Sequence, residues 1–448
     1  MKPTITLEPK ATKPVLAALT KRNAAHAARF PGDFAGRQPV HTVYGGAHLF
    51  KSDSAKKLGE LAIRSLTRYA PDAKTFALAL GMDQAIAQRV YNRVVDKLKH
   101  EAVEDFRIDF EDGYGNRPDA EEDGHAVAAA HEVAKGLEDG TLPPFIGIRI
   151  KTFSNELSAR SIRTMDVFLT TLIRQTKGQL PPWICVTLPK IVHPGQAAAL
   201  AKLLDAFERK KKLKPNTIKV ELMVETPQSI FAADGTAPLR AMVEELGARC
   251  TGAHFGTYDY TASCNVTAAQ QRMRHPACDF AKSVMQVTLA GTGVTMSDGA
   301  TNVMPVGPHR AAPGEYLSAE QDRENVEAVR RAWKLHYDDA THSLVNGFYQ
   351  GWELHPAQLP TRYAAVYAFF ISGLPQATAR LKNFIDKAAQ ATLVGDVFDD
   401  AATGQGLLNY FLRARNCGAI TAEEAAATGL TPAEFATRSF LKILEGRR

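Results

Sequence analysis

The sequence predicts an α/β protein built on a (β/α)8 TIM barrel, and three observations lead to this prediction. Short runs of β-branched and other apolar residues recur eight times, alternating with longer segments of helical period. The first run is followed by Gly45-Gly46-Ala47-His48, which lacks the glycine fingerprint of a dinucleotide-binding sheet. Charged residues gather where the runs end, as they do at the carboxyl ends of barrel strands. Together these features favour a closed barrel over a doubly wound sheet.

The expected strands and helices alternate along the middle of the chain. The strands are expected at residues 41–46, 106–110, 145–150, 184–188, 219–224, 252–256, 302–306 and 351–355. The helices are expected at residues 55–69 with 84–103, and at 120–137, 157–175, 195–211, 228–246, 280–289 and 319–346. Each strand run is short and bounded by turn residues, whereas each helical segment repeats its apolar positions every three to four residues.

Segments of a different pattern flank the predicted barrel. Residues 1–38 are expected to form an N-terminal helical extension, and residues 39–375 the barrel that carries the catalytic site. Residues 376–448 are rich in alanine and helical in pattern, with glycine breaks, and are expected to form a C-terminal helical lid or oligomerisation region. Within that region, Thr431-Pro432-Ala433-Glu434 has the residue order of a helix start.

Composition excludes several functional classes. The chain has 448 residues, is 45% hydrophobic and carries a formal net charge of +6, which is ordinary for a globular protein. Its densest basic cluster, residues 209–214, lacks aromatic neighbours and ends a helical pattern, so a solvated helix end is favoured over nucleic-acid binding. No run of about 18 apolar residues indicates a membrane span. The five cysteines are scattered without a C-x-x-C pair, and the N-terminus lacks signal-peptide features. We therefore expect a cytoplasmic protein that binds a small molecule.

Two carboxylates at predicted strand ends are candidate metal ligands. Glu225 and Asp259 each follow an apolar run, where an unpaired carboxylate is costly to bury. Carboxylates from adjacent strands can share one hard cation, and Mg2+ suits a site with few protein ligands because it retains water. The alternative is that both residues cap helices, since Glu225-Thr226-Pro227 has the composition of a helix start.

Arg149 lies inside an apolar run, so its guanidinium needs an anionic partner. A substrate carboxylate bound through two hydrogen bonds is one option. A structural ion pair with Glu111 or Asp112, at the end of the preceding strand, is the other. Both can hold in turn if the substrate displaces or joins the ion pair.

Lys190 follows another predicted strand and raises a second mechanism. A Schiff-base aldolase uses a lysine whose pKa is lowered. Many carboxylates surround Lys190 in the predicted barrel, and these would raise its pKa, so charge balance is the favoured role. Four histidines near strand ends remain candidates for acid–base work, although none has metal-motif spacing: His48, His254, His309 and His355.

Six motifs follow one another in an order that resembles the HpcH/HpaI aldolase and citrate lyase β-subunit family. The resemblance covers about residues 40–375. It implies a (β/α)8 barrel that makes or breaks a carbon–carbon bond beside a 2-oxo acid or acyl thioester, using Mg2+ or Mn2+. The motifs are Asp109-Phe110-Glu111-Asp112, Ile148-Arg149-Ile150, Leu188-Pro189-Lys190, Val224-Glu225-Thr226, Gly256-Thr257-Tyr258-Asp259-Tyr260 and Trp352-Glu353-Leu354-His355-Pro356-Ala357-Gln358.

The resemblance also implies roles for individual residues. Glu225 and Asp259 would bind the metal, and Arg149 would bind the substrate carboxylate or the developing enolate. The carboxylates of Glu111 and Asp112 would orient metal-bound waters. Thr226 and Gly256 would lie against the substrate. The expected activity is therefore a Mg2+-dependent carbon–carbon lyase or aldolase acting on a 2-oxo acid or a 3-hydroxy dicarboxylic acid. A Schiff-base aldolase using Lys190 and a non-catalytic ligand-binding barrel are the alternatives.

Two features depart from the family pattern. Thioester-using relatives carry an early basic loop for the coenzyme A phosphates, and residues 45–51 do not match it, so a coenzyme A thioester substrate is left open. Those relatives also take a general-acid aspartate from a neighbouring subunit, and Asp396, Asp399 and Asp400 lie in the corresponding part of this chain without aligning to that role. The resemblance further implies a homo-oligomer, a trimer or a hexamer.

Overall fold

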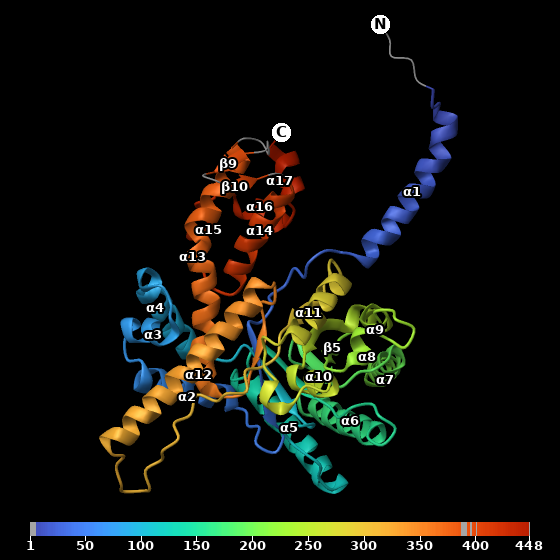
Figure 1. Cartoon of the computed structure of the whole chain (residues 1–448). Helices are drawn as coiled ribbons and strands as arrows, with labels where there is room; N and C mark the ends of the chain where they lie inside the picture. Colours follow the sequence, from blue (N-terminus) through green and yellow to red (C-terminus); the bar gives the residue numbers. More distant parts are fainter. Residues whose placement is uncertain (1–5, 387–391, 395–396, 400, 448) are drawn as a thin grey trace.

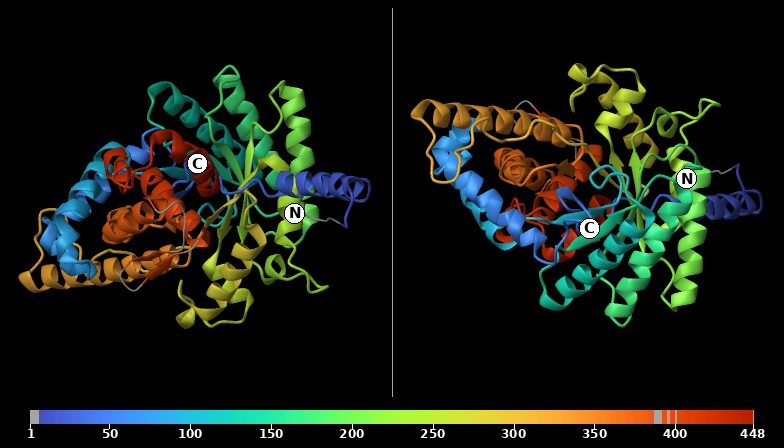
Figure 2. Two further views of the ribbon diagram at one scale, coloured as in Figure 1. Left: turned by 90° about the horizontal axis from the view of Figure 1, so that it is seen from above. Right: turned by 90° about the horizontal axis from the view of Figure 1, so that it is seen from below.

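The computed structural model describes residues 6–386, 392–394, 397–399 and 401–447. Eight parallel strands form one sheet in the order β7-β6-β5-β4-β3-β2-β1-β8. Backbone that follows β7 reaches β8, because Ala300 bridges Trp352 and the Trp352 N–H donates to the Gly299 carbonyl. The strands therefore form a nearly closed barrel with helices around it (Figures 1 and 2), which confirms the predicted fold class.

Seven of the eight expected strands lie where the apolar runs predicted them. The strands are β1 (His41–Gly46), β2 (Asp105–Asp109), β3 (Phe145–Arg149), β4 (Ile184–Leu188), β5 (Lys219–Val224), β6 (Cys250–Phe255), β7 (Thr295–Ser297) and β8 (Gly351–Glu353). The fully buried strands read as continuous apolar runs because helices cover their outer faces.

The prediction for the seventh strand was wrong. Residues 302–306 are irregular, with Val303 and Val306 largely exposed, and their proline cannot donate a ladder hydrogen bond. The strand is instead Thr295–Ser297, which pairs in parallel with β6. Two of its three residues are polar, so the sequence contains no apolar run that would identify this strand, and only its pairing with β6 reveals it.

The helices follow the expected alternation with two differences. The barrel helices are α2 (Ser54–Tyr69), α3 (Ala73–Leu80), α4 (Gln84–His100), α5 (Asp119–Asp139), α6 (Ser158–Gln175), α7 (Pro194–Lys211), α8 (Pro227–Ile230), α9 (Leu239–Leu246), α10 (Thr257–Ser263), α11 (Pro276–Leu289) and α12 (Ala319–Val345). The expected helix 228–246 is divided into α8 and α9 by a turn in which Asp234 accepts the Thr236 N–H and Gly235 has a left-handed φ of 78°. Helices α3 and α10 were not expected. None of the described helices is long and apolar enough to cross a membrane.

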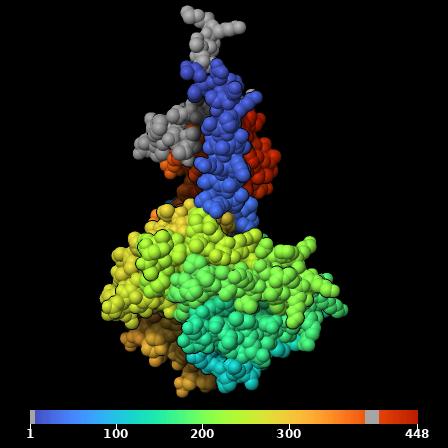
Figure 3. Space-filling model, turned by 90° about the vertical axis from the view of Figure 1, so that its right-hand side faces the viewer, coloured from blue at the N-terminus to red at the C-terminus, as the bar shows by residue number. Residues whose placement is uncertain are grey.

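The amino-terminal helix α1 (Pro9–Arg29) stands away from the barrel. None of its residues is buried, and Figures 1 and 3 show it projecting from the body of the molecule. Helix α1 therefore adds nothing to the interior of its own chain.

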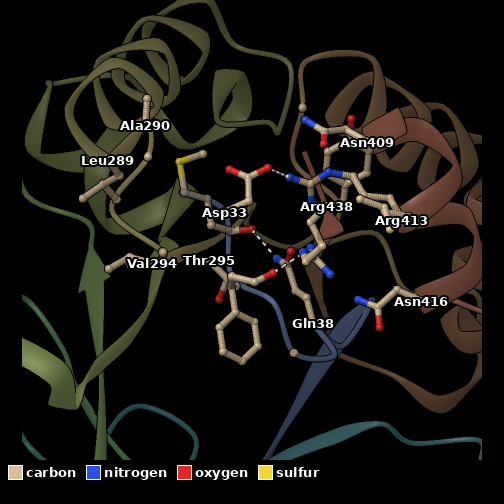
Figure 4. Close-up of a pocket in the computed structure, with 18 residues that line it drawn as sticks. Asp33, Gln38, Leu289, Ala290, Val294, Thr295, Asn409, Arg413, Asn416 and Arg438 are labelled. Carbon is tan, nitrogen blue, oxygen red and sulfur yellow. Dashed lines mark hydrogen bonds and ion pairs between the residues drawn. The ribbon is translucent and has the colours of Figure 1, made fainter. Parts of the chain in front are cut away.

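The carboxy-terminal region packs at the amino ends of the strands. Helix α13 (Leu359–Asp386) runs through the expected boundary at residue 375 and leads to β9 (Thr392–Val394), β10 (Val397–Asp399), α14 (Ala401–Asn416), α15 (Ala422–Ala426), α16 (Pro432–Thr437) and α17 (Phe440–Arg447). Arg438 donates to the Phe34 and Ala35 carbonyls, and Arg413 pairs with Asp33 at 3.4 Å. A small pocket of about 90 Å³ lies here, lined in part by Asp33, Phe34, Arg413, Arg438 and Thr295, the first residue of β7 (Figure 4). The described part of this region thus lies at the end of the barrel opposite the carboxyl ends of the strands and does not cover them.

A buried ionic network fills the amino-terminal half of the barrel interior. Arg107 of β2 contacts Asp105 and lies 3.0 Å from Glu221 of β5, and His254 of β6 lies 2.8 Å from the same glutamate. These charges are compensated inside the barrel, so this layer supports the strands from within. The charged residues at the other end of the strands form a separate group.

Candidate metal and active site

The residues predicted for the site meet at the carboxyl ends of β2 to β6. Arg149 is the last residue of β3, and Glu111 and Asp112 follow β2. Lys190 follows β4, Glu225 follows β5 directly, and Asp259 lies in the first turn of α10 after β6. The parallel strands bring these residues to one edge, where contacts among their side chains connect five of the six directly: Glu111, Asp112, Arg149, Lys190 and Asp259.

Arg149 is fully engaged by carboxylates. Its Nε donates to Asp109 Oδ1 at 2.7 Å and its Nη2 to the other oxygen of Asp109, while Nη1 lies 3.1 Å from Glu111. The guanidinium also lies over the rings of Tyr44 and Trp352, at 4.9 and 5.5 Å from their centroids. Burial disfavours the charged guanidinium, but the hydrogen bonds and charge of Asp109 more than offset this, and the pKa of Arg149 is raised.

Asp109 is the main partner of Arg149, although no role was predicted for it. The ion pair was expected with Glu111 or Asp112, whereas Asp109 makes the two-point contact. Asp109 is held in turn by the N–H groups of Glu111 and Gly113, at 2.9 and 2.7 Å. The β2–β3 register, which only the structure shows, places Asp109 directly opposite Arg149.

Lys190 places a positive charge among the carboxylates. Its Nζ contacts Glu111, lies 2.9 Å from Asp112 and 3.7 Å from Asp259, and its backbone N–H donates to Glu225 Oε1 at 2.8 Å. Burial acts to lower its pKa, but the charges of Glu225 and Glu111 more than offset this and the pKa of Lys190 is raised. A raised pKa keeps the amine protonated, which argues against Lys190 as a Schiff-base nucleophile.

Glu225 is a buried carboxylate at the centre of this edge. It is 2% exposed, and burial together with the negative charge of Asp259 raises its pKa to about 8. The neighbouring Thr226, not Glu225, caps α8, because the Thr226 hydroxyl accepts the Ser229 N–H. The alternative that Glu225 is a helix cap is therefore wrong.

Gly256 is close to Glu225 and leaves it room. A Cβ on Gly256 would lie 2.4 Å from Oε2 of Glu225 and 2.5 Å from its Cβ. The Thr226 hydroxyl donates to the Ile191 carbonyl at 2.7 Å. Gly256 thus leaves space for the Glu225 carboxylate, and Thr226 holds the loop after β4 through Ile191. Contacts of Gly256 and Thr226 with the substrate stay a prediction.

The substitution Gly256→Ala is expected to push Glu225 out of position. The new methyl group would overlap the carboxylate and its Cβ, so we expect metal affinity to fall by at least about tenfold and stability by about 1–3 kcal/mol. Titration calorimetry with Mg2+ or Mn2+ and thermal unfolding measure the two effects. In α5, Gly124→Ala is the matched control, because its Cβ would meet nothing within 4 Å. Equal metal affinity in the two variants would contradict the prediction.

The donor set of this edge fits a divalent cation. Glu225 and Asp259 supply carboxylate oxygens from adjacent strands, and the Lys190 ammonium shows that a positive charge is stable among these acids. Within the described residues, no group of three or more His, Cys, Asp or Glu side chains is arranged to hold a metal ion. With two carboxylates as its donors, the site fits an ion such as Mg2+ that keeps several waters.

A cavity of about 580 Å³ opens beside these carboxylates. It lies between the loop after β3, the loop after β4 and the start of α10, and Lys190, Glu225 and Asp259 form one of its walls. Its volume falls in the range of small-molecule sites. The carboxylate cluster is thus reached through a space large enough for an organic substrate.

Three of the four candidate histidines have contacts away from this cluster. His254 pairs with Glu221 in the buried ionic network of the barrel interior, and His309 pairs with Glu324. The His355 side chain accepts the Ala357 N–H in a helix cap. His48 lies beside Tyr114 and His125. Asp396 and Asp400 lie outside the described residues, as does the side chain of Asp399.

Comparison with known proteins assigns the family. A family model described as "Domain of unknown function (DUF6986)" matches residues 19–443. The chain belongs to this family. A search of curated proteins finds no match.

Several solved structures are similar to this DUF6986 chain. A citrate lyase from Burkholderia xenovorans LB400 superposes with a TM-score of 0.56 at 18% identity, over 88% of this chain and 96% of that one. CitE from Mycobacterium tuberculosis, in complex with magnesium, acetoacetate and coenzyme A, gives 0.45 at 16% identity, over 86% and 98%. Haloferax volcanii malate synthase gives 0.47 at 13% identity, over 89% and 96%. The citrate lyase match confirms the fold that the ordered motifs implied.

Proposed function

We propose that this DUF6986 chain is a divalent-metal-dependent carbon–carbon lyase or aldolase that acts on a 2-oxo acid or a 3-hydroxy dicarboxylic acid. The observation that carries the proposal is the buried Glu225 carboxylate beside Asp259, at the open end of a barrel and next to a substrate-sized cavity. Glu225 is buried and feels the negative charge of Asp259, whose side chain is partly exposed, and the Lys190 ammonium compensates these charges only in part, since the pKa of Glu225 stays raised. A divalent cation bound by the two carboxylates would compensate them further. The fold shared with a citrate lyase adds support.

Glu225 and Asp259 would hold the Mg2+ or Mn2+ ion. When bound, such an ion supplies Lewis-acid stabilisation to the negative charge that develops on a 2-oxo acid as its carbon–carbon bond breaks. Arg149 would bind the substrate carboxylate through Nη1, which the substrate would share with Glu111 or take from it, while Asp109 holds Nε and Nη2 in place. Glu111 and Asp112 would accept hydrogen bonds from water, and Lys190 would balance their charge.

Proton exchange at the methyl group of pyruvate tests the activity without knowledge of the full substrate. In D2O, the enzyme with Mg2+ or Mn2+ is expected to exchange the C3 protons of pyruvate, followed by NMR, and EDTA is expected to abolish the exchange. Absence of exchange, of turnover on a panel of oxo acids and of metal binding by calorimetry would instead favour a non-catalytic ligand-binding barrel.

The Schiff-base alternative has its own test. Borohydride treatment in the presence of pyruvate and excess EDTA is expected to leave Lys190 unmodified, because its raised pKa keeps the amine protonated. A reduced pyruvoyl adduct on Lys190 by mass spectrometry would overturn the metal-dependent mechanism.

Assembly is a further expected property. The chain is expected to form a homo-oligomer, a trimer or a hexamer, at micromolar concentration. Light scattering coupled to size exclusion measures the mass directly. A mass equal to one chain would contradict this prediction.

A further inference from the structure

We infer that the site takes a free acid whose far end is uncharged and bears hydroxyl groups, and that it selects against a terminal carboxylate and against a coenzyme A thioester. This inference rests on the proposed function, because it places the reacting carbons at Glu225 and Asp259, and it narrows the proposed substrates to 2-oxo acids that lack a second carboxylate. It follows from the walls of the cavity that begins there.

The cavity is larger than a three-carbon acid requires. Its volume of about 580 Å³ is many times the roughly 30 Å³ that one water occupies in the liquid. It extends from Glu225 and Asp259 along residues 152–156 after β3 and residues 192–196 after β4. A substrate held at the carboxylates would therefore direct its remaining carbons along these two loops.

Side chains that form hydrogen bonds line this space. Hydroxyl, amide and imidazole groups come from Thr152, Ser154, Asn155, His193 and Ser263. Gln196 also reaches the cavity, but its amide is already used between the Phe153 carbonyl and the Val192 N–H. Hydroxyl and amide groups both donate and accept, so they match the hydroxyl groups of a substrate chain.

The charges of the walls are predominantly negative. Three carboxylates line the cavity, those of Glu156, Glu225 and Asp259, and the one ammonium among its lining residues is that of Lys190. Lys190 is already held by Glu111, Asp112 and Asp259. A hydrogen bond from Ser154 lowers the pKa of Glu156, so this residue is ionised at neutral pH. A terminal carboxylate on the substrate would therefore meet Glu156 with no free cation in the lining.

Neighbouring loops offer little to the phosphates of coenzyme A. Arg160 and Arg163 of α6, which follows the 152–156 loop, pair with Asp123 at 2.5 and 2.6 Å. Lys51 lies in the region where thioester-using relatives carry their basic loop, and it pairs with Glu132 at 3.2 Å. Phosphate recognition relies on arginine and lysine groups that are available to the ligand, and at these three a phosphate would have to compete with Asp123 or Glu132.

Two aldehyde substrates with the same number of carbons test whether the cavity selects by the charge of the substrate's far end and not by its size. In an aldol addition, pyruvate loses a C3 proton, C3 bonds to the aldehyde carbon, and the aldehyde oxygen takes up a proton, so no oxidant is needed. Glyceraldehyde would leave an uncharged hydroxylated end and tartronate semialdehyde a carboxylate end. The wild-type enzyme is expected to prefer glyceraldehyde by at least about tenfold in kcat/KM.

A charge reversal at Glu156 tests whether this carboxylate causes the selectivity against a terminal carboxylate. Glu156→Lys is expected to shift the kcat/KM ratio toward tartronate semialdehyde by at least about tenfold, with Glu156→Gln between the two. Glu244→Lys on α9 is the matched control, since it changes net charge equally and lies outside the cavity lining, and its ratio is expected to equal that of wild type. Coenzyme A at millimolar concentration is expected neither to inhibit nor to give heat in calorimetry.

The outcomes distinguish this inference from the proposed function. If pyruvate exchanges its C3 protons but the wild type prefers the carboxylate aldehyde, or Glu156→Lys leaves the ratio unchanged, the assigned selectivity is wrong and the metal-dependent chemistry stands. Tight binding of coenzyme A would overturn the exclusion of thioesters. If no exchange occurs, the proposed function itself fails.

Discussion

Replacing Glu225 by glutamine is expected to lower kcat/KM for retro-aldol cleavage by at least about a thousandfold, because electrostatic stabilisation by a bound metal supplies several kcal/mol. The amide keeps the shape of the side chain and can still accept the Lys190 N–H. It loses the negative charge that a divalent cation needs. The loss should therefore appear in metal affinity and turnover, and not in folding.

Calorimetric metal titration, steady-state kinetics and circular dichroism measure these three properties of Glu225→Gln. Glu60→Gln on α2 is the matched control, because Glu60 is exposed and lies beside the residues that precede β2 and β3, at the amino ends of the strands. Near-normal turnover of Glu225→Gln, or unchanged Mn2+ affinity, would disprove the assignment of Glu225 as a metal ligand.

In the metal-free chain, the effect of Glu225→Gln on the free energy of unfolding is expected to depend on pH. The pKa of Glu225 is raised to about 8 by burial and by Asp259, so between the ordinary glutamate pKa and about pH 8 the folded state keeps a proton that the unfolded state has lost. The stability contributed by this proton is complete at low pH and is lost as the pH rises through that window. In EDTA, the free energy of unfolding of Glu225→Gln relative to wild type is therefore expected to increase from about pH 5 to about pH 8. A constant difference would contradict the burial of Glu225 in a charged pair.

Substitutions of Arg149 are expected to separate its structural and substrate roles. Arg149→Met would leave Asp109 buried without its cation, at a cost of about 3–5 kcal/mol in stability. Arg149→Lys keeps the charge but cannot hold Asp109 at two points and reach the substrate at the same time. We expect Arg149→Lys to fold and to lose at least about a hundredfold in kcat/KM, with metal affinity unchanged.

Arg249 provides a matched control for Arg149. It is equally buried and is bound by Glu208 and Asp205, at the start of β6 and so at the opposite end of the barrel. Arg249→Lys is expected to lose stability while kcat/KM stays near wild type. If Arg149→Lys behaves in the same way, Arg149 is only a structural ion-pair partner.

The positions of the site residues could be predicted because barrel geometry is regular. Apolar runs of five or six residues located seven of the strands within two residues at either end, and in a parallel barrel the carboxyl ends of all strands meet on one rim. The sequence could not reveal which acid pairs with Arg149, because that depends on the register of β2 against β3. The site roles themselves await the experiments above.

The sequence by itself determined the barrel, the order of its strands and the group of charged residues at their carboxyl ends. These features are local, since each depends on the period of a short segment and on the residue that follows it. Tertiary structure decided the rest: β7 at Thr295–Ser297, the Asp109–Arg149 pair, and the C-terminal helices at the opposite end of the barrel. Each of these depends on contacts between segments distant in sequence, and no single segment encodes them.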